Sequence, residues 1–574
     1  MDPLAKHQIA GIGIIQQRAL WAGARYAELE ARRPGMTAKR YAETAISLFT
    51  ECGWLAAWDM GAGKTRAGLY VMAAWETLAQ RSVNATWTAA MRRPMLVLGE
   101  ASGIHVWKNQ LALWFPGAPA NFILPVETGA QVAEALKLAE SGGVSALSIS
   151  YSLLTRHVDL FAQAKFSLVI HDEIQALTNQ NAQRSQALYR IARIREDNLP
   201  GMLFKLGLSG TPFTNRVDSL WPVTSYLQGV PKARRTGRPN PKRPRDEVHF
   251  FMVSNVWGTR AAFMSKYTTD GVMGKNLLHD PRSYKECNYH SFAECDKLHP
   301  RLLNQIMHRV TAEEAWPNLP SVDLEWIDVE LPKSQRELYD SLVDDMVLPA
   351  IAVENGAGVS VEVNRLALMT LAFECLASGK QLQYSLRNRP ELELPFGANE
   401  SGILDEIERI CREMPDSESI IIFAEYEQFA HQIAERLKWL RPVVLAGGTG
   451  NAQQAEADFQ DPKKGHRAFV ATRRGIKALT LTKARYCVIA GFLSYSPWDI
   501  LQAIYRIRRP GQKAERLMIY ALSVKGTLLA WLKTRLAQKL QSGLQVLDGS
   551  TVGAEQLNIQ DMTKKQFRDA FRGE

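Results

Sequence analysis

The sequence predicts an α/β protein with two parallel-sheet domains and helical insertions between and within them. Short apolar runs alternate with helix-like patterns over the first 229 residues, and the same alternation returns after residue 416. Apolar runs of this kind are typical of strands buried on both faces, as in parallel sheets. The length of 574 residues also exceeds what a single hydrophobic core usually supports.

The expected strands follow from these runs in chain order. In the first domain they are residues 53–58, 95–98, 146–149, 166–170 and 203–208. In the second domain they are residues 420–423, 443–445, 468–471, 486–490 and 517–522. A helix is expected over residues 66–78, directly after the first strand.

Two stretches between these domains depart from the alternation. Residues 230–247 are rich in Pro, Lys and Arg, which predicts an exposed loop, and residues 335–415 are mostly helical in pattern. The predicted organisation is a first domain (1–229), a basic loop and helical linker region (230–334), a helical protrusion (335–415), a second domain (416–545) and a C-terminal helical extension (546–574).

The composition indicates an intracellular protein with a polyanionic partner. Lys plus Arg minus Asp plus Glu is 69 − 59, a net charge of +10, which suits nucleic acid although soluble proteins without such a partner also reach it. Six scattered Cys favour a reducing compartment. No leader-like segment follows Met1 and no apolar run approaches 18 residues, so we expect a soluble cytoplasmic monomer without a membrane partner.

The segment AWDMGAGKT predicts a phosphate-binding turn between a strand and a helix. Gly61 and Gly63 allow backbone N–H groups to approach a triphosphate, Lys64 can reach its terminal phosphates, and Thr65 can ligate Mg²⁺. Trp58 stands where the full P-loop pattern has its first glycine. A helix-capping glycine turn is the alternative, and the later motifs argue against it.

Two carboxylates end the strand at residues 166–170 and follow His171. Asp172 can hold Mg²⁺ through water, and Glu173 can orient or deprotonate an attacking water. Ser209-Gly210-Thr211 follows the next strand and is either a simple β-turn or a loop that senses the nucleotide. Near the C-terminus, Arg506 and Arg509 lie three residues apart and would share one helix face, from which a guanidinium can stabilise a transferring phosphoryl group.

Taken in order, these segments resemble the Swi/Snf-type ATPases of helicase superfamily two. The resemblance covers nearly the whole chain, and it is most specific in QAIYRIRRPGQK, which also separates the chain from DEAD-box RNA helicases. It implies two RecA-like lobes that bind ATP and Mg²⁺ at their interface. The residues it assigns to nucleotide binding are Gln8, Met60, Gly61, Ala62, Gly63, Lys64 and Thr65. Those it assigns to catalysis are Lys64, Asp172, Glu173, Arg506 and Arg509, with Thr65 and Asp172 on the metal.

The resemblance also implies DNA as the partner, double-stranded or branched, and a role in replication, recombination or repair. The expected DNA contacts are Ser102, Arg156, Lys232, Arg234, Arg235, Arg243, Arg245, Arg473, Arg474 and Lys477. A strand-separating helicase, an RNA-polymerase-recycling remodeller and an inactive DNA-binding scaffold remain alternatives. A compact chain of this kind suits a phage or bacterial source by analogy.

Several features depart from the family pattern or have a second interpretation. Gln175 stands where the family usually has His, and residues 23–52 are inserted before the P-loop. The side chains of Cys287, His290, Cys295 and His299 could bind zinc, although their spacing is not that of a usual finger. The basic stretch at 230–247 could instead be a solvated loop or a nuclear signal.

Overall fold

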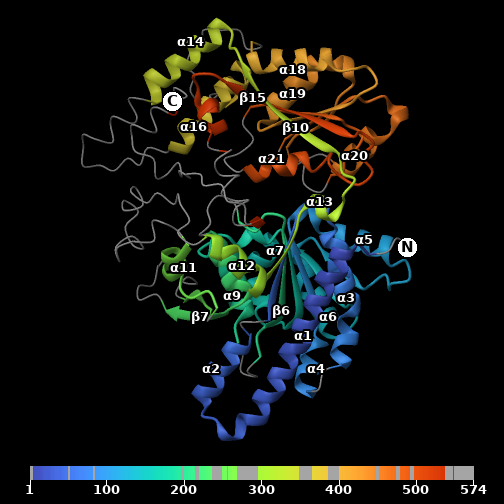
Figure 1. Ribbon diagram of the computed structural model, residues 1–574, viewed down its shortest axis with the longest axis vertical. Coiled ribbons are helices and arrows are strands. Elements are labelled where there is room, and N and C mark those ends of the chain that lie inside the picture. Colours follow the sequence, from blue (N-terminus) through green and yellow to red (C-terminus); the bar gives the residue numbers. More distant parts are fainter. Residues whose placement is uncertain are drawn as a thin grey trace, which may run out of the picture. The chain divides into compact units, whose positions relative to one another are not determined.

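The computed structural model divides the chain into two compact units, each built on its own parallel sheet (Figure 1). The first unit takes its described residues from 1–272, 291–317 and 543–552, and the second takes most of its own from 318–542. The residues that the structure describes are 4–49, 52–81, 84–194, 199–213, 219–235, 248–254, 256–267, 295–347, 365–385, 400–447, 451–472, 479–491, 497–534, 536, 547–548 and 570.

The first sheet has seven parallel strands in the order β3-β4-β2-β5-β6-β1-β9. Its strands are β1 (Gly53–Trp58), β2 (Met95–Gly99), β3 (Ile123–Val126), β4 (Ala146–Ser150), β5 (Phe166–Asp172), β6 (Met202–Leu208) and β9 (Met307–Val310). The five predicted strands of this domain are all confirmed. β3 and β9 were not predicted, because Pro125 interrupts the apolar run of β3 and His308 and Arg309 interrupt that of β9.

Helices cover both faces of this sheet; Figure 1 shows α1 and α3 on one side and α9 on the other. The helices of the first unit are α1 (Lys6–Arg32), α2 (Ala38–Phe49), α3 (Lys64–Gln80), α4 (Ala85–Met91), α5 (Val106–Trp114), α6 (Gly129–Glu140), α7 (Tyr151–Arg156), α8 (Val158–Phe161), α9 (Gln183–Ala192), α10 (Leu220–Leu227), α11 (Arg260–Tyr267), α12 (Cys295–Gln305) and α13 (Ala312–Ala315).

The inserted residues before the P-loop form the end of α1 and all of α2. Buried aromatic rings fasten this helical pair to α4: Tyr26 and Phe49 lie 5.5 Å and 6.4 Å from the Trp87 ring. Aromatic pairs at such separations add to the stabilisation from buried area. The insertion is therefore an integral part of the first unit.

The basic stretch that was predicted as an exposed loop begins as a strand. β7 (Val230–Arg235) pairs antiparallel with β8 (Val248–Val253), and residues 236–247 lie outside the described residues. Pro231 is tolerated because a two-stranded ribbon leaves one edge free of ladder bonds. The side chain of Gln186 on α9 bonds both the N–H and the C=O of Phe250, which holds the ribbon on the first unit.

The region 230–334, predicted as a loop and linker, also supplies a strand to each sheet. β9 extends the first sheet, and β10 (Ser321–Val329) pairs along its full length with β15 (Arg516–Val524) in the second. β10 is an edge strand that was not predicted, because Asp323, Glu325 and Asp328 interrupt its apolar pattern. Charged side chains on an edge strand also oppose pairing with other chains.

The second sheet has six parallel strands in the order β10-β15-β14-β11-β13-β12. The remaining strands are β11 (Ile420–Ala424), β12 (Val443–Leu445), β13 (Ala468–Thr472) and β14 (Tyr486–Ile489), which confirms the predicted set. The helices are α14 (Lys333–Ser341), a π-helical turn (Leu342–Val347), α16 (Arg365–Ala377), α17 (Gly379–Ser385), α18 (Gly402–Glu413), α19 (Glu427–Arg436), α20 (Ala452–Gln460) and α21 (Pro497–Ile504).

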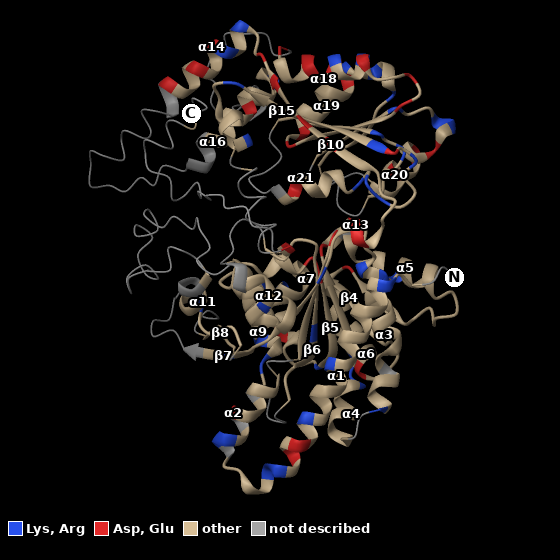
Figure 2. Ribbon diagram, viewed as in Figure 1, with Lys and Arg blue, Asp and Glu red and all other residues tan. Residues whose placement is uncertain are grey.

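The surface of the second unit carries mixed charge. Figure 2 shows basic and acidic residues interspersed along α18, where Arg409 pairs with Glu406 and Glu413. Among the described residues, no helix combines the length and apolar character needed to cross a bilayer.

A buried lysine fastens the end of α10 to the first sheet. Lys205 on β6 donates from Nζ to the carbonyl oxygens of Tyr226 and, at 2.9 Å, of Gly229. A cation at the last carbonyls of a helix is favoured by their partial negative charge. Burial nevertheless lowers the pKa of Lys205 to about 7, an effect that the nearby Cys52 partly offsets.

The lysine predicts a pH-dependent stability. Between pH 7 and the ordinary lysine pKa, the unfolded chain binds more protons than the folded chain, so the cost of burying Lys205 shrinks as pH rises. Relative to Lys205→Met, we expect the wild-type free energy of unfolding to gain roughly 3 kcal/mol between about pH 7 and about pH 9.5. Urea unfolding of both proteins measures this, and a difference that does not change with pH would contradict it.

Candidate nucleotide site

The predicted nucleotide residues of the first unit meet at the carboxyl edge of its sheet. Strand register places Asp172 beside Leu208 and Leu208 beside Ala56, so the segments after β5, β6 and β1 leave the sheet at nearly the same level. This edge is where open parallel sheets bind ligands.

The P-loop has the backbone of a phosphate cradle. Gly61 and Gly63 both have φ of 81°, in the left-handed region that favours glycine, and α3 begins directly afterwards at Lys64. Successive N–H groups in such a turn form an anion-binding nest at a helix N-terminus. The Lys64 ammonium donates to the carbonyls of Trp58 at 2.9 Å and Asp59 at 3.1 Å, which holds it over the turn.

The first turn of α1 lies against the P-loop. Gln8 is buried, accepts a hydrogen bond from the N–H of Ala5 and donates to the carbonyl of Gly63 at 3.3 Å. His7 bonds the carbonyl of Ala62 at 2.8 Å. Gly63 has φ of 81°, which favours glycine, and a β-carbon there would lie 2.1 Å from the Gln8 amide nitrogen, so any larger residue would also displace Gln8. Gln8 is thus brought to the P-loop, as its assignment to nucleotide binding requires.

The Asp172 carboxylate is buried next to Glu173, where its ionised form is costly. The indole N–H of Trp107 donates to its Oδ2 at 3.2 Å, and the hydroxyl of Tyr151 donates to its backbone carbonyl at 3.3 Å. Burial, followed by repulsion from Glu173, raises the pKa of Asp172 to about 6, while Trp107 and Lys64 lower it. Lys64 and Asp172 therefore interact electrostatically at the edge of the sheet.

Glu173 and Gln175 connect the carboxylates to the Ser-Gly-Thr turn. Glu173 has φ of 57°, a left-handed conformation that is unusual for a residue other than glycine and tends to mark functional sites. The Gln175 amide donates to Glu173 Oε2 at 2.6 Å and accepts from the Ser209 hydroxyl at 2.7 Å. Ser209 in turn accepts from the N–H of Thr211 at 2.9 Å. Because one amide supplies both the donor and the acceptor, Gln175 makes this connection without the titratable imidazole of the His that the family usually has here.

The donor set suits Mg²⁺. This ion prefers oxygen ligands and usually keeps several waters, with one or two protein groups and the phosphates of the substrate. The Thr65 hydroxyl and the Asp172 carboxylate are such groups. Among the described residues, no three His, Cys, Asp or Glu side chains gather as a separate metal cluster. Of the four side chains that could bind zinc, Cys287 and His290 lie outside the described residues.

Arg506 and Arg509 lie in the second unit, directly after α21. Arg506 is buried and donates to the carbonyl of Leu479 at 3.4 Å. Arg509 donates to the Thr480 hydroxyl at 2.7 Å and to the carbonyl of Tyr505 at 2.8 Å. Burial lowers the pKa of Arg509, and Glu456 on α20 acts in the opposite direction. Both guanidinium groups are thus held by the segment at 479–480.

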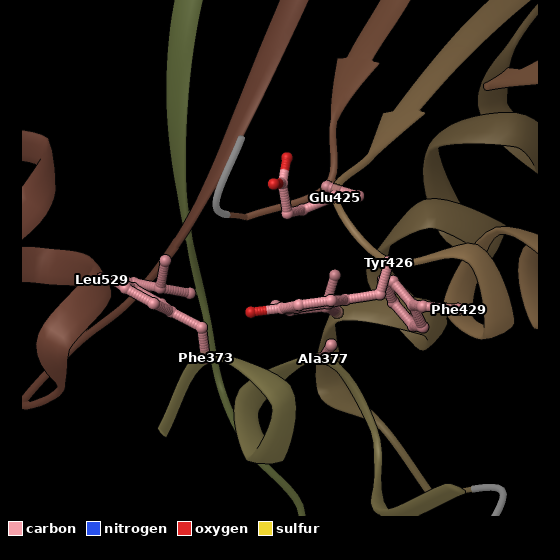
Figure 3. Close-up of a pocket in the computed structure, with 8 residues that line it drawn as sticks. Phe373, Ala377, Glu425, Tyr426, Phe429 and Leu529 are labelled. Carbon is pink, nitrogen blue, oxygen red and sulfur yellow. The ribbon is translucent and has the colours of Figure 1, made fainter. Parts of the chain in front are cut away.

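A small cavity in the second unit lies at the carboxyl end of β11 (Figure 3). Phe373, Ala377, Tyr426, Phe429 and Leu529 line it together with the Glu425 carboxylate. Its volume of about 10 Å³ is room for roughly one water molecule, so a nucleotide does not fit in it.

The predicted DNA contacts are only partly described. Arg156 at the end of α7 and Lys232 on β7 have exposed side chains. For Ser102, Arg234 and Arg235 the backbone alone is described. Arg243, Arg245, Arg473, Arg474 and Lys477 lie outside the described residues.

Sequence reasoning missed several partners of the site. Trp107 is one, since its contact with Asp172 joins residues 65 positions apart. Asp59, Arg309 and Trp316 are others: an ion pair joins Asp59 to Arg309, 250 positions away, and Trp316 donates to the carbonyl of Gly61 at 2.9 Å. No local pattern signals such contacts, because only the sheet brings the segments together.

Comparison with known proteins gives a family match and distant relatives. Residues 16–234 match the SNF2-related domain. An uncharacterised ATP-dependent helicase of Mycoplasma genitalium is 23% identical over 51% of this chain and 22% of its own length. The human SWI/SNF-related matrix-associated actin-dependent regulator of chromatin, subfamily A member 1, is 19% identical over 73% of this chain and 35% of its own. The chain thus spans about a fifth to a third of the length of these relatives.

Among solved structures, the SWI2/SNF2 ATPase core of Sulfolobus solfataricus in complex with double-stranded DNA aligns over 99% of this chain and 97% of its own. The identity is 17% and the TM-score 0.36. The helicase domain of Pyrococcus furiosus Hef aligns over 85% and 95%, with 13% identity and a TM-score of 0.44.

A P-loop strand and a carboxylate-bearing strand lie on either side of one strand, and a second parallel sheet follows later in the chain, which is the arrangement expected of a RecA-like ATP hydrolase. The match of residues 16–234 to the SNF2-related domain agrees with the resemblance to Swi/Snf-type ATPases that the sequence motifs indicate.

The raised pKa of Asp172 predicts how hydrolysis depends on pH. A carboxyl group holds Mg²⁺ only when ionised, so kcat/KM for ATP should fall as pH drops through about 6. In Trp107→Phe the carboxylate loses an N–H that favours its charged form, so the midpoint should move to higher pH. Steady-state rates between about pH 5 and 8 measure both, and a midpoint that stays in place in the variant would contradict the assignment.

Proposed function

We propose that this chain is a DNA-dependent ATPase that translocates on double-stranded DNA and remodels DNA structures or DNA–protein complexes. The observation that carries the proposal is the joined arrangement of the P-loop, the Asp172–Glu173 pair and the Ser209 turn at one edge of the first sheet. Replication, recombination and repair are the settings in which such an activity is needed.

Each side chain at this edge has a role in the proposed reaction. Backbone N–H groups of the P-loop and the Lys64 ammonium bind the triphosphate. Thr65 and Asp172 would hold Mg²⁺, which neutralises phosphate charge when bound. Glu173 orients the attacking water or takes its proton, and its contact with Gln175 fixes the carboxylate for that task.

DNA is the favoured partner because of charge and family. The net charge of +10 suits a polyanion, and phosphate contacts imply weak sequence preference. The name of the human relative describes a regulator of chromatin. The exposed Arg156 and Lys232, together with Ser102, Arg234, Arg235, Arg243, Arg245, Arg473, Arg474 and Lys477, are the proposed contacts. The proposed location is the cytoplasm, in contact with the nucleoid or with phage DNA.

Strand separation is the second candidate, because the Mycoplasma genitalium relative is named a helicase. The two activities differ in whether hydrolysis is accompanied by release of a labelled strand. An inactive scaffold is a third possibility, which the presence of Lys64, Asp172 and Glu173 disfavours.

The first test measures phosphate release with duplex, single-stranded, forked and RNA ligands. We expect duplex or forked DNA to stimulate the wild-type chain most. Lys64→Ala should remove turnover because the triphosphate loses the P-loop cation, and Glu173→Gln should bind MgATP but stall before hydrolysis. Turnover near the wild-type rate in both variants would refute the site. Stimulation by RNA alone would refute the proposed partner, and DNA binding without wild-type turnover would support the scaffold.

The second test concerns the paired arginines of the second unit. If Arg506 and Arg509 act on the transferring phosphoryl group, Arg506→Ala or Arg509→Ala should lower hydrolysis by about a thousandfold with little change in MgADP affinity. Arg508→Ala is the matched control, since its guanidinium bonds the carbonyl of Pro320 at 3.0 Å. If the first two variants lose only about twofold, like the control, the arginines serve packing alone.

A further inference from the structure

The P-loop is held from its outer side as well as from within the sheet. Three successive carbonyl oxygens each meet a side-chain nitrogen: Gly61 accepts from Trp316 Nε1 at 2.9 Å, Ala62 bonds His7 Nε2 at 2.8 Å, and Gly63 accepts from Gln8 at 3.3 Å. His7 and Gln8 come from α1, whereas Trp316 comes from the chain that follows β9.

Residues 309–316 form a strap across the start of the P-loop. The Asp59 carboxylate accepts from the N–H of Ala312 at 3.0 Å through Oδ2 and pairs with Arg309 through Oδ1. Arg309 is almost fully buried, also bonds the carbonyl of Ala57 at 3.1 Å, and pairs with Asp548 at 2.6 Å. The strap therefore contacts the start of the P-loop at both Asp59 and Gly61.

These contacts set the direction of the peptide groups. A peptide unit is planar, with its C=O and N–H on opposite sides, so a carbonyl that is fixed outward fixes the next N–H inward. The peptide between Gly61 and Ala62 is held in this way: Trp316 binds its C=O, and its N–H closes the turn on the Asp59 carbonyl at 3.2 Å.

The strap also solves an electrostatic problem. Asp59 is an anion at the mouth of a loop that is built to bind a triphosphate, and its bare charge would oppose the ligand. The ion pair with Arg309 offsets part of that charge, since Arg309 is shared with Asp548, and it leaves the Asp59 carboxylate able to accept from Ala312. In this arrangement the strap shapes the loop and weakens a repulsive charge beside it.

We propose that Asp59, Arg309 and Trp316 are positioning residues for nucleotide binding, holding the P-loop in its phosphate-binding shape from the side away from the ligand. The inference rests on the proposed function and extends it to Arg309 and Trp316, which lie 250 and 255 positions from their P-loop partners Asp59 and Gly61 in sequence. None of the three needs to touch the nucleotide.

The test compares two tryptophans that each donate an indole N–H to a glycine carbonyl in the first unit. Trp316 donates to Gly61, and Trp221 donates at 3.2 Å to Gly258, a carbonyl that is not part of the P-loop. Phe keeps the ring bulk and removes the N–H. We expect Trp316→Phe to weaken MgADP binding to the full chain about fivefold, the effect of one lost hydrogen bond, while Trp221→Phe binds as the wild type does.

A kinetic readout separates positioning from general packing. A loop that spends less time in its binding shape raises the KM for ATP and leaves kcat nearly unchanged, because saturating nucleotide restores the shape. Arg309→Gln should act in the same direction, because it removes the ion pair and leaves the Asp59 charge uncompensated. The double variant should lose less than the product of the single effects, since both residues hold one turn.

The outcomes decide between these possibilities. Equal MgADP affinity in Trp316→Phe and the wild type, or equal losses in both tryptophan variants, would overturn the inference. If Trp316→Phe does not fold, Arg309→Gln carries the test, and an unchanged KM in it has the same meaning. Absence of MgADP binding by the wild-type chain would overturn the proposed function along with the inference.

Discussion

Parallel pairing of β1, β6 and β5 is the constraint on which the candidate site depends. Backbone hydrogen bonds between these strands align three segments that lie far apart in the chain, and each segment leaves the sheet with a different chemical group. The P-loop supplies N–H donors and a lysine, the end of β5 supplies two carboxylates, and the end of β6 supplies a hydroxyl. A slip of one residue in the register would turn each of these side chains toward the opposite face.

Buried polar groups keep this edge in shape. Burial makes the ionised form of Asp172 costly, but two hydrogen bonds hold the residue beside the P-loop. Trp107 donates to its carboxylate and Tyr151 donates to its backbone carbonyl. Gln175 joins Glu173 to Ser209 through one amide. Such networks are rigid when every member is satisfied, and the cost of losing one partner is then high. Neutral donors thus hold the two carboxylates at this edge in place.

The second unit presents a different arrangement. Its two arginines are held by the segment at 479–480, and Glu456 acts on them as an opposing charge. Guanidinium groups keep their charge even where burial lowers their pKa, so they remain suited to work on phosphate. The chain therefore divides its chemistry: donors and carboxylates are in the first unit, and guanidinium groups are in the second.

Local patterns in the sequence determined the two α/β units, their long buried strands, the P-loop and the carboxylate pair. Each of these depends on neighbouring residues: an apolar run, a glycine that allows positive φ, or charges at the end of a strand. The strands β3, β9 and β10 were missed, because a proline in β3 and polar residues in β9 and β10 interrupt the apolar runs. Only the tertiary structure decided that β7 is part of a ribbon, that Trp107 meets Asp172 and that Trp316 meets Gly61. Those contacts depend on which strands lie side by side, and that is set by packing of the whole sheet.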